Sequence, residues 1–447
     1  MAEPRRSGAP QVRSAAVAAD RAAYDYGLFS FSSKEEVLEK AKAYWNPGKT
    51  QFWIDSGVPL VIDRREDYFL WDMTGKRLID CHLNGGTYNL GHRNPEVVGA
   101  VTAAMQHFDI GNHHFPALAR TALAEALIDS APPGLTKVMY ASGGGEAIDI
   151  ALKTARHATQ KRKILSIVKA YHGHTGIAVG AGDERFSAIF LSDQPDDFPH
   201  VPFNDLVAME EALSGRDIAA VIMETIPATY GFPLPDPGYL RAVKALCEKY
   251  DALYIADEVQ TGLMRTGELW GISKEGIEPD ILVTGKGISG GLYPIACVLA
   301  SEKASGWLTE DGFAHMSTFG GAELGCIAAM KTLEICRRPE TRSIVHWISD
   351  TIGSGLRAIQ ADYPDWFTGI RQNGVIFGLE FDHPQGAKYV MRHLYEGGVW
   401  AIFSTLDPRV LQYKPGILLK PEVAEELLDR TEVAIRRARA EVRGSSR

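Results

Sequence analysis

The chain has 447 residues, of which 45% are hydrophobic and 23% charged, a composition typical of a globular protein large enough for two domains. Its formal net charge of −9 argues against nucleic acid and acidic membrane surfaces as partners. Because no apolar run is long enough for a membrane helix and the first residues lack the apolar core of a secretory signal, we expect a cytoplasmic protein.

The N-terminal part of the chain is predicted to hold a helix and short strands. Residues 1–30 start with a stretch rich in Ala, Arg, Ser and Pro without periodicity, which predicts a mobile tail. Ser33 is a typical helix cap, and the helix after it should end at Asn46-Pro47-Gly48. Two short strands, at residues 60–62 and 68–71, should follow.

From about residue 95, buried apolar strands alternate with helices. This alternation is typical of an α/β fold with a mostly parallel sheet covered by helices on both faces. The predicted strands lie at residues 137–140, 164–168, 219–223, 253–256 and 281–283. We assign residues 81–329 to a large domain, and residues 31–80 and 330–447 to a small α+β domain formed by both ends of the chain.

Two charged residues follow consecutive predicted strands, Asp257 after residues 253–256 and Lys286 after residues 281–283. Because ligands bind at the carboxyl ends of strands in open α/β sheets, both side chains should lie at one site. An amine can hold an aldehyde cofactor and an acid can protonate its ring nitrogen. The pair therefore points to pyridoxal phosphate (PLP).

Each of these residues has a structural alternative. Asp257 could cap a helix over residues 258–264, and Lys286 could be a solvated lysine in a glycine loop. The glycines around Lys286 also satisfy a GxGxxG pattern, which would suggest a nucleotide-binding oxidoreductase. That match is weak, because Gly290-Gly291-Leu292-Tyr293-Pro294 prevents the amphipathic helix that the motif requires.

Further candidate ligand contacts lie at the same predicted sheet edge. Ser142-Gly143-Gly144-Gly145 precedes a predicted helix, so its backbone N–H groups can bind a phosphate. Tyr171 and His172 follow a strand, and the tyrosine ring could stack on a flat heterocycle. His172 and His174 lack a third ligand and the five cysteines show no CxxC spacing, so we predict no metal. Glu224 could orient the cofactor or bond loop amides.

Taken together, these segments resemble the class III aminotransferases, the ω-transaminase branch of the fold-type I PLP enzymes. The resemblance spans roughly residues 50–435 and covers motifs that occur in order along the chain. These motifs are Leu90–Pro95, Ser142–Glu146, Tyr171–Gly173, Asp257–Gly262, Arg265–Gly267, Lys286–Gly291 and Ser317–Gly321.

The resemblance implies fold type I, in which a mostly parallel seven-stranded sheet covered by helices forms the large domain. It implies a transaminase that moves an amino group between a small-molecule amine donor and a carbonyl acceptor. It also implies a homodimer whose active sites are shared across the interface between the two subunits. The resemblance implies that Lys286 holds the cofactor covalently and that Asp257 pairs with its ring nitrogen. It implies that Val259 and Tyr171 pack on the two faces of the ring and that Gln260 bonds the phenolic oxygen. The phosphate would be bound by the backbone of Gly143 to Gly145 and by Thr318 of the neighbouring subunit.

Two departures from the family pattern bear on the substrate. Gly86 stands where many relatives have a bulky aromatic, and Gln412 stands where relatives that handle α-amino acids often have an arginine. Gln412 cannot reproduce a bidentate carboxylate clamp, so we expect a roomy pocket for a bulky amine or aldehyde without an α-carboxylate. Phe52, Trp53 and Tyr88 are candidate apolar walls of this pocket, or alternatively core residues.

Another departure lies at the phosphate site, where the family usually carries Ser and Thr and this chain has Gly143 and Gly145. Phosphate binding should then depend more on backbone amides, with Ser142 compensating.

An aminomutase or epimerase of the same fold stays open as an alternative. A non-catalytic PLP-binding protein is a further alternative, although such a protein would usually carry a basic DNA-binding region.

Overall fold

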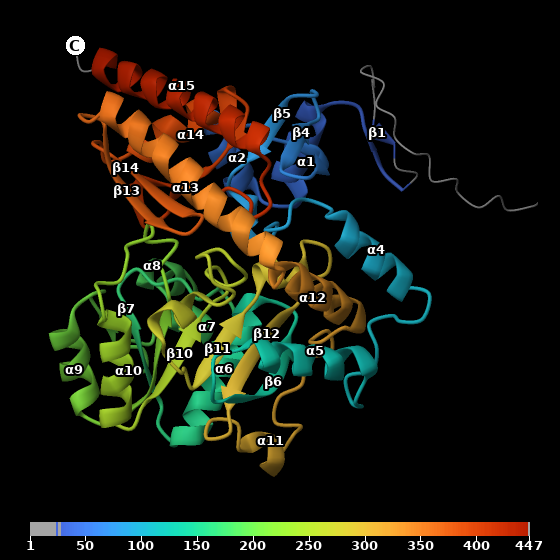
Figure 1. The fold of residues 1–447 in the computed structure, drawn as a ribbon, viewed down its shortest axis with the longest axis vertical. Helices are drawn as coiled ribbons and strands as arrows, with labels where there is room; N and C mark the ends of the chain where they lie inside the picture. The colour runs from blue at the N-terminus through green and yellow to red at the C-terminus, as the bar shows by residue number, and fades with distance from the viewer. Residues whose placement is uncertain (1–23, 26–27, 446–447) are drawn as a thin grey trace, which may run out of the picture. The chain divides into compact units, whose positions relative to one another are not determined.

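The computed structural model describes residues 24–25 and 28–445 (Figure 1). Most of the predicted tail, residues 1–30, therefore lies outside the described residues. The chain divides into two compact units. The first comprises residues up to Arg64 together with Trp71–Lys76, and the second comprises Arg65–Leu70 and Arg77–Arg447. The domain boundaries predicted after residues 80 and 329 stay a prediction.

The first unit contains a second helix that the sequence analysis missed. Ser33 caps the predicted helix, accepting a hydrogen bond from the Glu36 N–H at 3.1 Å. A new helix then begins where only an end was predicted, because Asn46 caps it and Pro47 occupies the first helical position, which needs no N–H donor. The elements are β1 (Tyr24–Asp25), β2 (Ser30–Phe31), α1 (Lys34–Tyr44) and α2 (Pro47–Asp55), with β3 (Ile62–Glu66) and β4 (Phe69–Asp72) containing residues of both units.

The second unit contains a seven-stranded sheet of order β6-β12-β11-β10-β9-β7-β8. All neighbouring strands pair in parallel except β12, which is antiparallel to both β11 and β6. The predicted mostly parallel seven-stranded sheet is thus confirmed. The strands are β6 (Leu135–Ala141), β7 (Lys163–Ile167), β8 (His200–Val201), β9 (Ile218–Glu224), β10 (Leu253–Asp257), β11 (Ile281–Thr284) and β12 (Ala296–Ser301).

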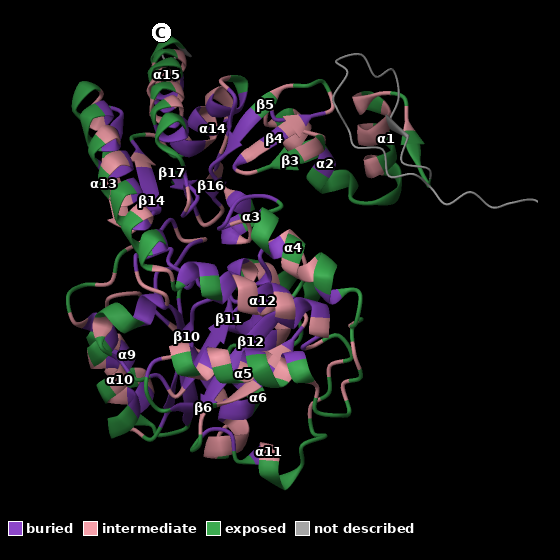
Figure 2. Ribbon diagram, turned by 45° about the vertical axis from the view of Figure 1, so that its right-hand side comes forward, coloured by how far each residue is buried: buried purple, intermediate pink, exposed green. Residues whose placement is uncertain are grey.

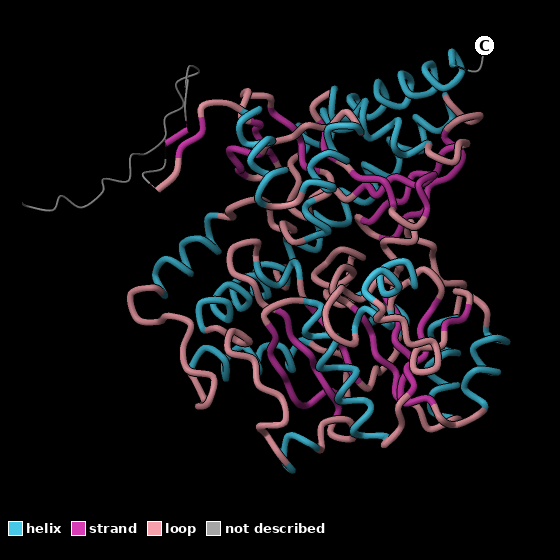
Figure 3. The backbone as a smooth tube through the Cα atoms, turned by 180° about the vertical axis from the view of Figure 1, so that it is seen from behind, coloured by secondary structure: helices cyan, strands magenta, loops and turns pink. Residues whose placement is uncertain are grey.

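The centre of this sheet is buried on both faces. Every residue of β9, β10 and β11 is buried, which explains their continuous apolar sequences. Helix α6 contributes Ile148, Ala151 and Leu152 to the core that the strands share. Figures 2 and 3 show the sheet enclosed by helices. The helices around it include α4 (Pro95–Ala104), α5 (Leu118–Ser130), α6 (Gly144–Thr159), α9 (Leu206–Ser214), α10 (Tyr239–Lys249) and α12 (Glu323–Cys336).

A smaller antiparallel sheet of order β13-β14-β17-β16 forms the C-terminal part of the second unit. Helices α13, α14 and α15 pack together beside it (Figure 1). Strand β5 (Arg77–Asp80) pairs in parallel with β15 (Val399–Trp400). The bounds are α13 (Pro339–Asp362), β13 (Phe367–Asn373), β14 (Ile376–Phe381), α14 (Gly386–Glu396), β16 (Ile402–Ser404), β17 (Asp407–Tyr413) and α15 (Pro421–Ser445).

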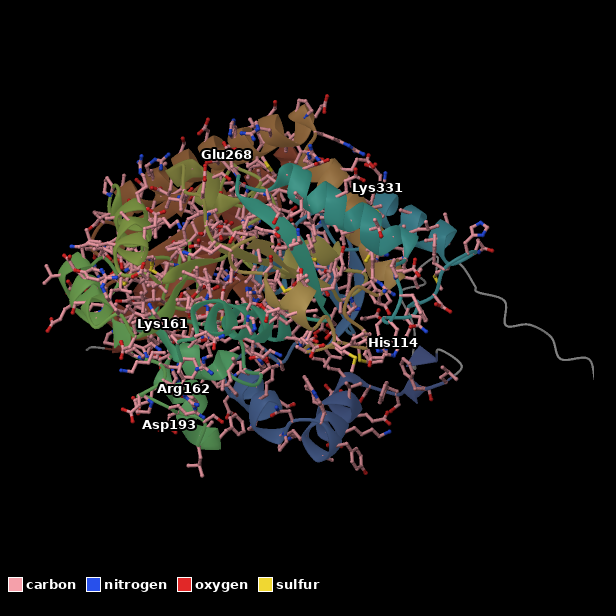
Figure 4. The ribbon with its side chains drawn as sticks, turned by 90° about the horizontal axis from the view of Figure 1, so that it is seen from below. His114, Lys161, Arg162, Asp193, Glu268 and Lys331 are labelled. Carbon is pink, nitrogen blue, oxygen red and sulfur yellow. The ribbon has the colours of Figure 1, made fainter. Side chains whose placement is uncertain are left out.

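Short helical turns complete the second unit. They are α3 (Leu83–Gly86), α7 (Ala178–Ala181), α8 (Glu184–Ser187) and α11 (Trp307–Glu310), with 3-10 turns at Ala188–Phe190, Gly271–Glu275 and Lys286–Ser289. Charged side chains such as Lys161, Arg162 and Asp193 lie at the periphery of this unit (Figure 4). Among the helices of the described residues, none has the length and apolar character needed to cross a membrane.

Candidate active site

Lys286 lies just beyond the carboxyl end of β11, as predicted. Its φ of +44° falls in the left-handed region, which is strained for a residue with a side chain. Its stem packs on the backbone of Gly85, where an added methyl group would lie 3.0 Å from Lys286 Cε. Burial lowers the pKa of Lys286, and the carboxylates of Asp257 and Glu224 act in the opposite direction. An amine in this environment is suited to act as a nucleophile or a base.

Asp257 is the last residue of β10 and is almost fully buried. Its Oδ2 lies 2.7 Å from Nδ1 of the buried His172, and its Oδ1 accepts a hydrogen bond from the Val259 N–H at 3.0 Å. On its other side, His172 Nε2 lies 3.5 Å from Ser166 Oγ. The alternative role for Asp257, as the cap of a helix over residues 258–264, is wrong because the chain forms no helix there.

Glu224 ends β9 beside Asp257, with which it is paired in register. Its two carboxylate oxygens accept hydrogen bonds from the N–H groups of Tyr171, at 3.1 Å, and Ala228, at 3.0 Å. Glu224 therefore bonds loop amides, and in doing so it holds the backbone of Tyr171. Burial raises the pKa of Glu224 to about 7, and the nearby Asp257 adds to the rise while His172 opposes it.

The predicted glycine turn does lead into a helix, α6, which begins at Gly144. Its first N–H groups find no acceptor within the described part of the chain, as is usual at a helix start. The N–H and hydroxyl of Ser142 both donate to Oε2 of Glu146, at 2.8 and 2.6 Å. A methyl group at Gly143 would have open space around it, whereas one at Gly145 would lie 2.6 Å from Thr175 Oγ1. Thr175 thus occupies the space that a side chain at position 145 would need.

Two cavities, of about 280 and about 190 Å³, share Lys286 and Gly144 in their walls. The larger is also lined by the predicted residues Tyr88, Ser142 and Gly143. The smaller brings together the other predicted contacts, which are Gly145, Tyr171, His172, Glu224, Asp257, Val259 and Gln260. An amine, a buried carboxylate and free helix amides around one space match the aldehyde, ring nitrogen and phosphate of PLP. The residues present therefore fit this cofactor.

Several predicted residues lie outside these walls. Thr318 is exposed in the segment between α11 and α12. Phe52 and Trp53 lie on α2 of the first unit, with ring centroids 5.1 Å apart, and their substrate role stays a prediction. Gly86 has a φ of +98°, and the described residues beyond its chain neighbours would place one atom, Asn89 Oδ1, within 4 Å of a methyl group there, at 3.7 Å. Among the described residues, no group of three or more His, Cys, Asp or Glu side chains is placed to hold a metal ion.

Gln412 is engaged by a residue whose role the sequence analysis missed, Lys414. The Lys414 Nζ donates to Gln412 Oε1 at 2.7 Å and to Gln260 Oε1 at 3.3 Å. Lys414 is fully buried just after β17, where its N–H donates to the Cys81 carbonyl at 2.8 Å. A sequence signal did exist, because residues two apart in an extended chain point to the same side, so Lys414 shares the side of Gln412.

The chain is similar in sequence and in structure to known aminotransferases. The family model described as aminotransferase class III matches residues 54–435. An uncharacterized aminotransferase of Archaeoglobus fulgidus is 40% identical, with 92% of this chain and 97% of that protein covered. The ornithine aminotransferase of Toxoplasma gondii has a similar structure, with a TM-score of 0.84, 24% identity, and 92% and 97% of the two chains covered. The omega transaminase PjTA-R6, in a tryptophan-to-glycine variant, also has a TM-score of 0.84 at 24% identity, covering 91% and 100% of the chains.

The fold of the second unit is that of the fold-type I PLP enzymes. Because the family match extends over most of the sequence and the 40% identical relative is covered almost in full, the chain belongs to the class III aminotransferase family. It is a PLP-dependent aminotransferase.

Proposed function

We propose that this aminotransferase acts on a bulky amine donor or carbonyl acceptor that lacks an α-carboxylate. The observation that carries the proposal is the absence of arginine from the lining of either cavity in the described chain. The buried Arg265 donates instead to the carbonyls of Pro415 and Val375, at 2.7 and 2.9 Å. With Gln412 bound to Lys414, no bidentate clamp for an α-carboxylate is available there.

The proposed roles of the cofactor-binding residues follow from their placement. Lys286 would hold the cofactor aldehyde, and Asp257 would pair with the ring nitrogen. Val259 and Tyr171 would lie on the two faces of the ring, and Gln260 would contact its phenolic oxygen. The amides at the start of α6, around Gly143, Gly144 and Gly145, would bind the phosphate, with His172 and Glu224 supporting Asp257 and Tyr171 from behind.

When bound, PLP supplies an electron sink that makes a proton on the substrate carbon acidic. The residues of the chain then move that proton. Once the donor amine has replaced it on the cofactor, Lys286 Nζ would accept the proton and return it to a different carbon, and the lowering of its pKa by burial favours the neutral amine that this role needs. Asp257 keeps its orientation during this transfer because His172 and the Val259 amide hold its two oxygens.

The proposal of a roomy pocket is supported by Gly86, because the nearest atom to its missing side chain, among the described residues beyond its chain neighbours, is Asn89 Oδ1 at 3.7 Å. A tryptophan-to-glycine change was made in PjTA-R6 to engineer it for the synthesis of bulky amines. A donor and acceptor panel on the purified enzyme tests the proposal, with the loss of cofactor absorbance on adding donor alone as the signal. We expect bulky amines to react faster than small α-amino acids, and the reverse order would refute the substrate assignment.

The same panel distinguishes a transaminase from the other kinds of PLP protein that the sequence left open. A transaminase loses the cofactor absorbance with donor alone and releases a carbonyl product. An epimerase or aminomutase regains the absorbance and forms no carbonyl compound. A non-catalytic PLP-binding protein would show neither change.

We also propose a homodimer in which Thr318 reaches the phosphate of the neighbouring subunit. Thr318 is exposed, and large apolar side chains near it in sequence are exposed as well, which is typical of a protein interface and supports the proposal. Phe313, Met316 and Phe319 have exposed fractions of 65%, 56% and 57%. The ring of the exposed His114, labelled in Figure 4, lies 6.3 Å from that of Phe313.

A further inference from the structure

Lys414 has surroundings that are unusual for a lysine. Its side chain is completely buried, and its Nζ faces two amide oxygens, Gln412 Oε1 at 2.7 Å and Gln260 Oε1 at 3.3 Å. The ring of the buried Phe232 lies below it, with its centroid 5.6 Å from Nζ. No carboxylate in the described chain lies within ion-pair distance of this nitrogen. A buried amine without an acidic partner is costly, so a packing role alone is a poor explanation for it.

The contacts of Lys414 fix how two glutamine amides are turned. A lysine ammonium group has three N–H donors and no acceptor, so it must face the oxygen and not the nitrogen of each amide. Gln260 also lines the smaller cavity, together with Lys286 and Val259. With its oxygen bound by Lys414, Gln260 has its Nε2, which is a donor, available for a ligand in that cavity.

We propose that Lys414 is a positioning residue that holds Gln260 with its N–H₂ group toward the bound cofactor, and that Gln412 keeps Lys414 in place. This inference rests on the proposed contact between Gln260 and the phenolic oxygen of PLP. In this arrangement the residue at the expected arginine position, Gln412, serves the cofactor through Lys414. The cluster Gln412, Lys414 and Gln260 joins β17 to the loop after β10.

The electrostatic surroundings of Lys414 are mostly positive. Burial lowers its pKa well below the ordinary value, and Arg265 and Lys286 lower it further, while Cys81 and Asp80 act in the opposite direction. His82 is affected in turn, because burial and the charges of Lys414 and Lys286 lower its pKa. The ammonium form is the one that fixes both amides, because a neutral amine would keep two N–H donors for the oxygens but would also have a lone pair able to accept from an amide N–H₂.

The test is a double-mutant cycle on PLP-loaded enzyme, with the bound cofactor's absorbance followed against pH and the dissociation constant of PLP measured alongside. Lys414→Met keeps the length of the side chain and removes its donors. Because Gln260 is then free to turn, we expect the pH midpoint of the absorbance change to rise by about one unit and PLP to bind about tenfold more weakly. Gln260→Leu should produce shifts of similar size, and the double variant should add nothing further.

The control is Lys249→Met, which removes an exposed lysine that pairs with Glu210 on the surface. Unchanged values in Lys414→Met, or additive shifts in the double variant, would overturn the inference. Gln412→Leu covers the case in which Lys414→Met fails to fold. It should give a smaller shift in the same direction, and an unshifted midpoint would count against the proposal. If PLP is attached at Lys286 in the wild-type protein and the variants still show no shift, this inference fails while the proposed function stands.

Discussion

Asp257 and His172 form a buried pair, with Oδ2 of the carboxylate 2.7 Å from Nδ1 of the imidazole. The side chain of His172 is inaccessible to solvent and that of Asp257 is 5% exposed. The sequence analysis predicted that both residues contact the cofactor. The structure places His172 so that it orients the carboxylate that the proposed ring contact needs, in the way that supporting residues commonly orient catalytic groups.

Replacing His172 should therefore weaken cofactor binding. In His172→Phe the Asp257 carboxylate keeps only the Val259 N–H as a partner, and a hydrogen bond to a charged group is worth about 1.5–3 kcal/mol. We expect the dissociation constant of PLP to rise at least about tenfold in an absorbance titration. His174→Phe, which changes the neighbouring exposed histidine, is the matched control. Equal affinities in the two variants would refute the positioning role.

The titration of Lys286 should be measurable in protein freed of cofactor. Because burial disfavours the ammonium form, competitive labelling of Lys286 against pH should have a midpoint below the ordinary value of 10.5. Glu224 is ionised above about pH 7 and favours the ammonium form, so Glu224→Gln should move the midpoint to still lower pH. A midpoint at or above 10.5, or an upward movement in Glu224→Gln, would contradict this description.

The width of the pocket can be tested at Gly86. Its φ of +98° is unfavourable for any residue with a side chain, so Gly86→Ala carries the backbone cost alone. Gly86→Trp carries the same cost and also fills the space. We expect kcat/KM for a bulky amine to fall at least about tenfold from the alanine to the tryptophan variant. Similar values in both variants would show that this space is not used by the substrate.

The proposed dimer can be tested at Met316, which is 56% exposed two residues before Thr318. Met316→Asp should place a charge in the interface. Analytical ultracentrifugation should then give the mass of one chain, 48.9 kDa, and not twice that mass. PLP should then bind more weakly, since Thr318 of the neighbouring subunit is lost. Val207→Asp changes a 78% exposed apolar residue on α9 and should leave both properties unchanged. A wild-type monomer with full PLP affinity would refute shared sites.

The sheet and most of the site could be predicted because their signals are local. Continuous apolar runs end at Glu224, Asp257 and Lys286, and parallel strands must bring such ends to one edge. Strand β12 was not among the predicted strands, because a short apolar run cannot be told from a buried helix segment by periodicity alone. The α2 helix was missed because Pro47 can begin a helix as well as follow the end of one.

The contact of Lys414 with Gln260 and that of His172 with Asp257 could not be predicted from local pattern. Lys414 meets Gln260 across 154 positions of sequence, and His172 meets Asp257 across 85. Each contact depends on how the loops after different strands converge. Such convergence is decided by tertiary packing, which neither periodicity nor residue spacing reports.

The most direct test of the whole account is borohydride reduction of the holoenzyme, followed by proteolysis and mass spectrometry. Reduction fixes the cofactor to the nitrogen that carries it, so the peptide containing Lys286 should gain the mass of the reduced pyridoxyl phosphate group. The buried Lys414 serves as an internal control and should stay unmodified. An unmodified Lys286, or a label found on another lysine, would contradict the account.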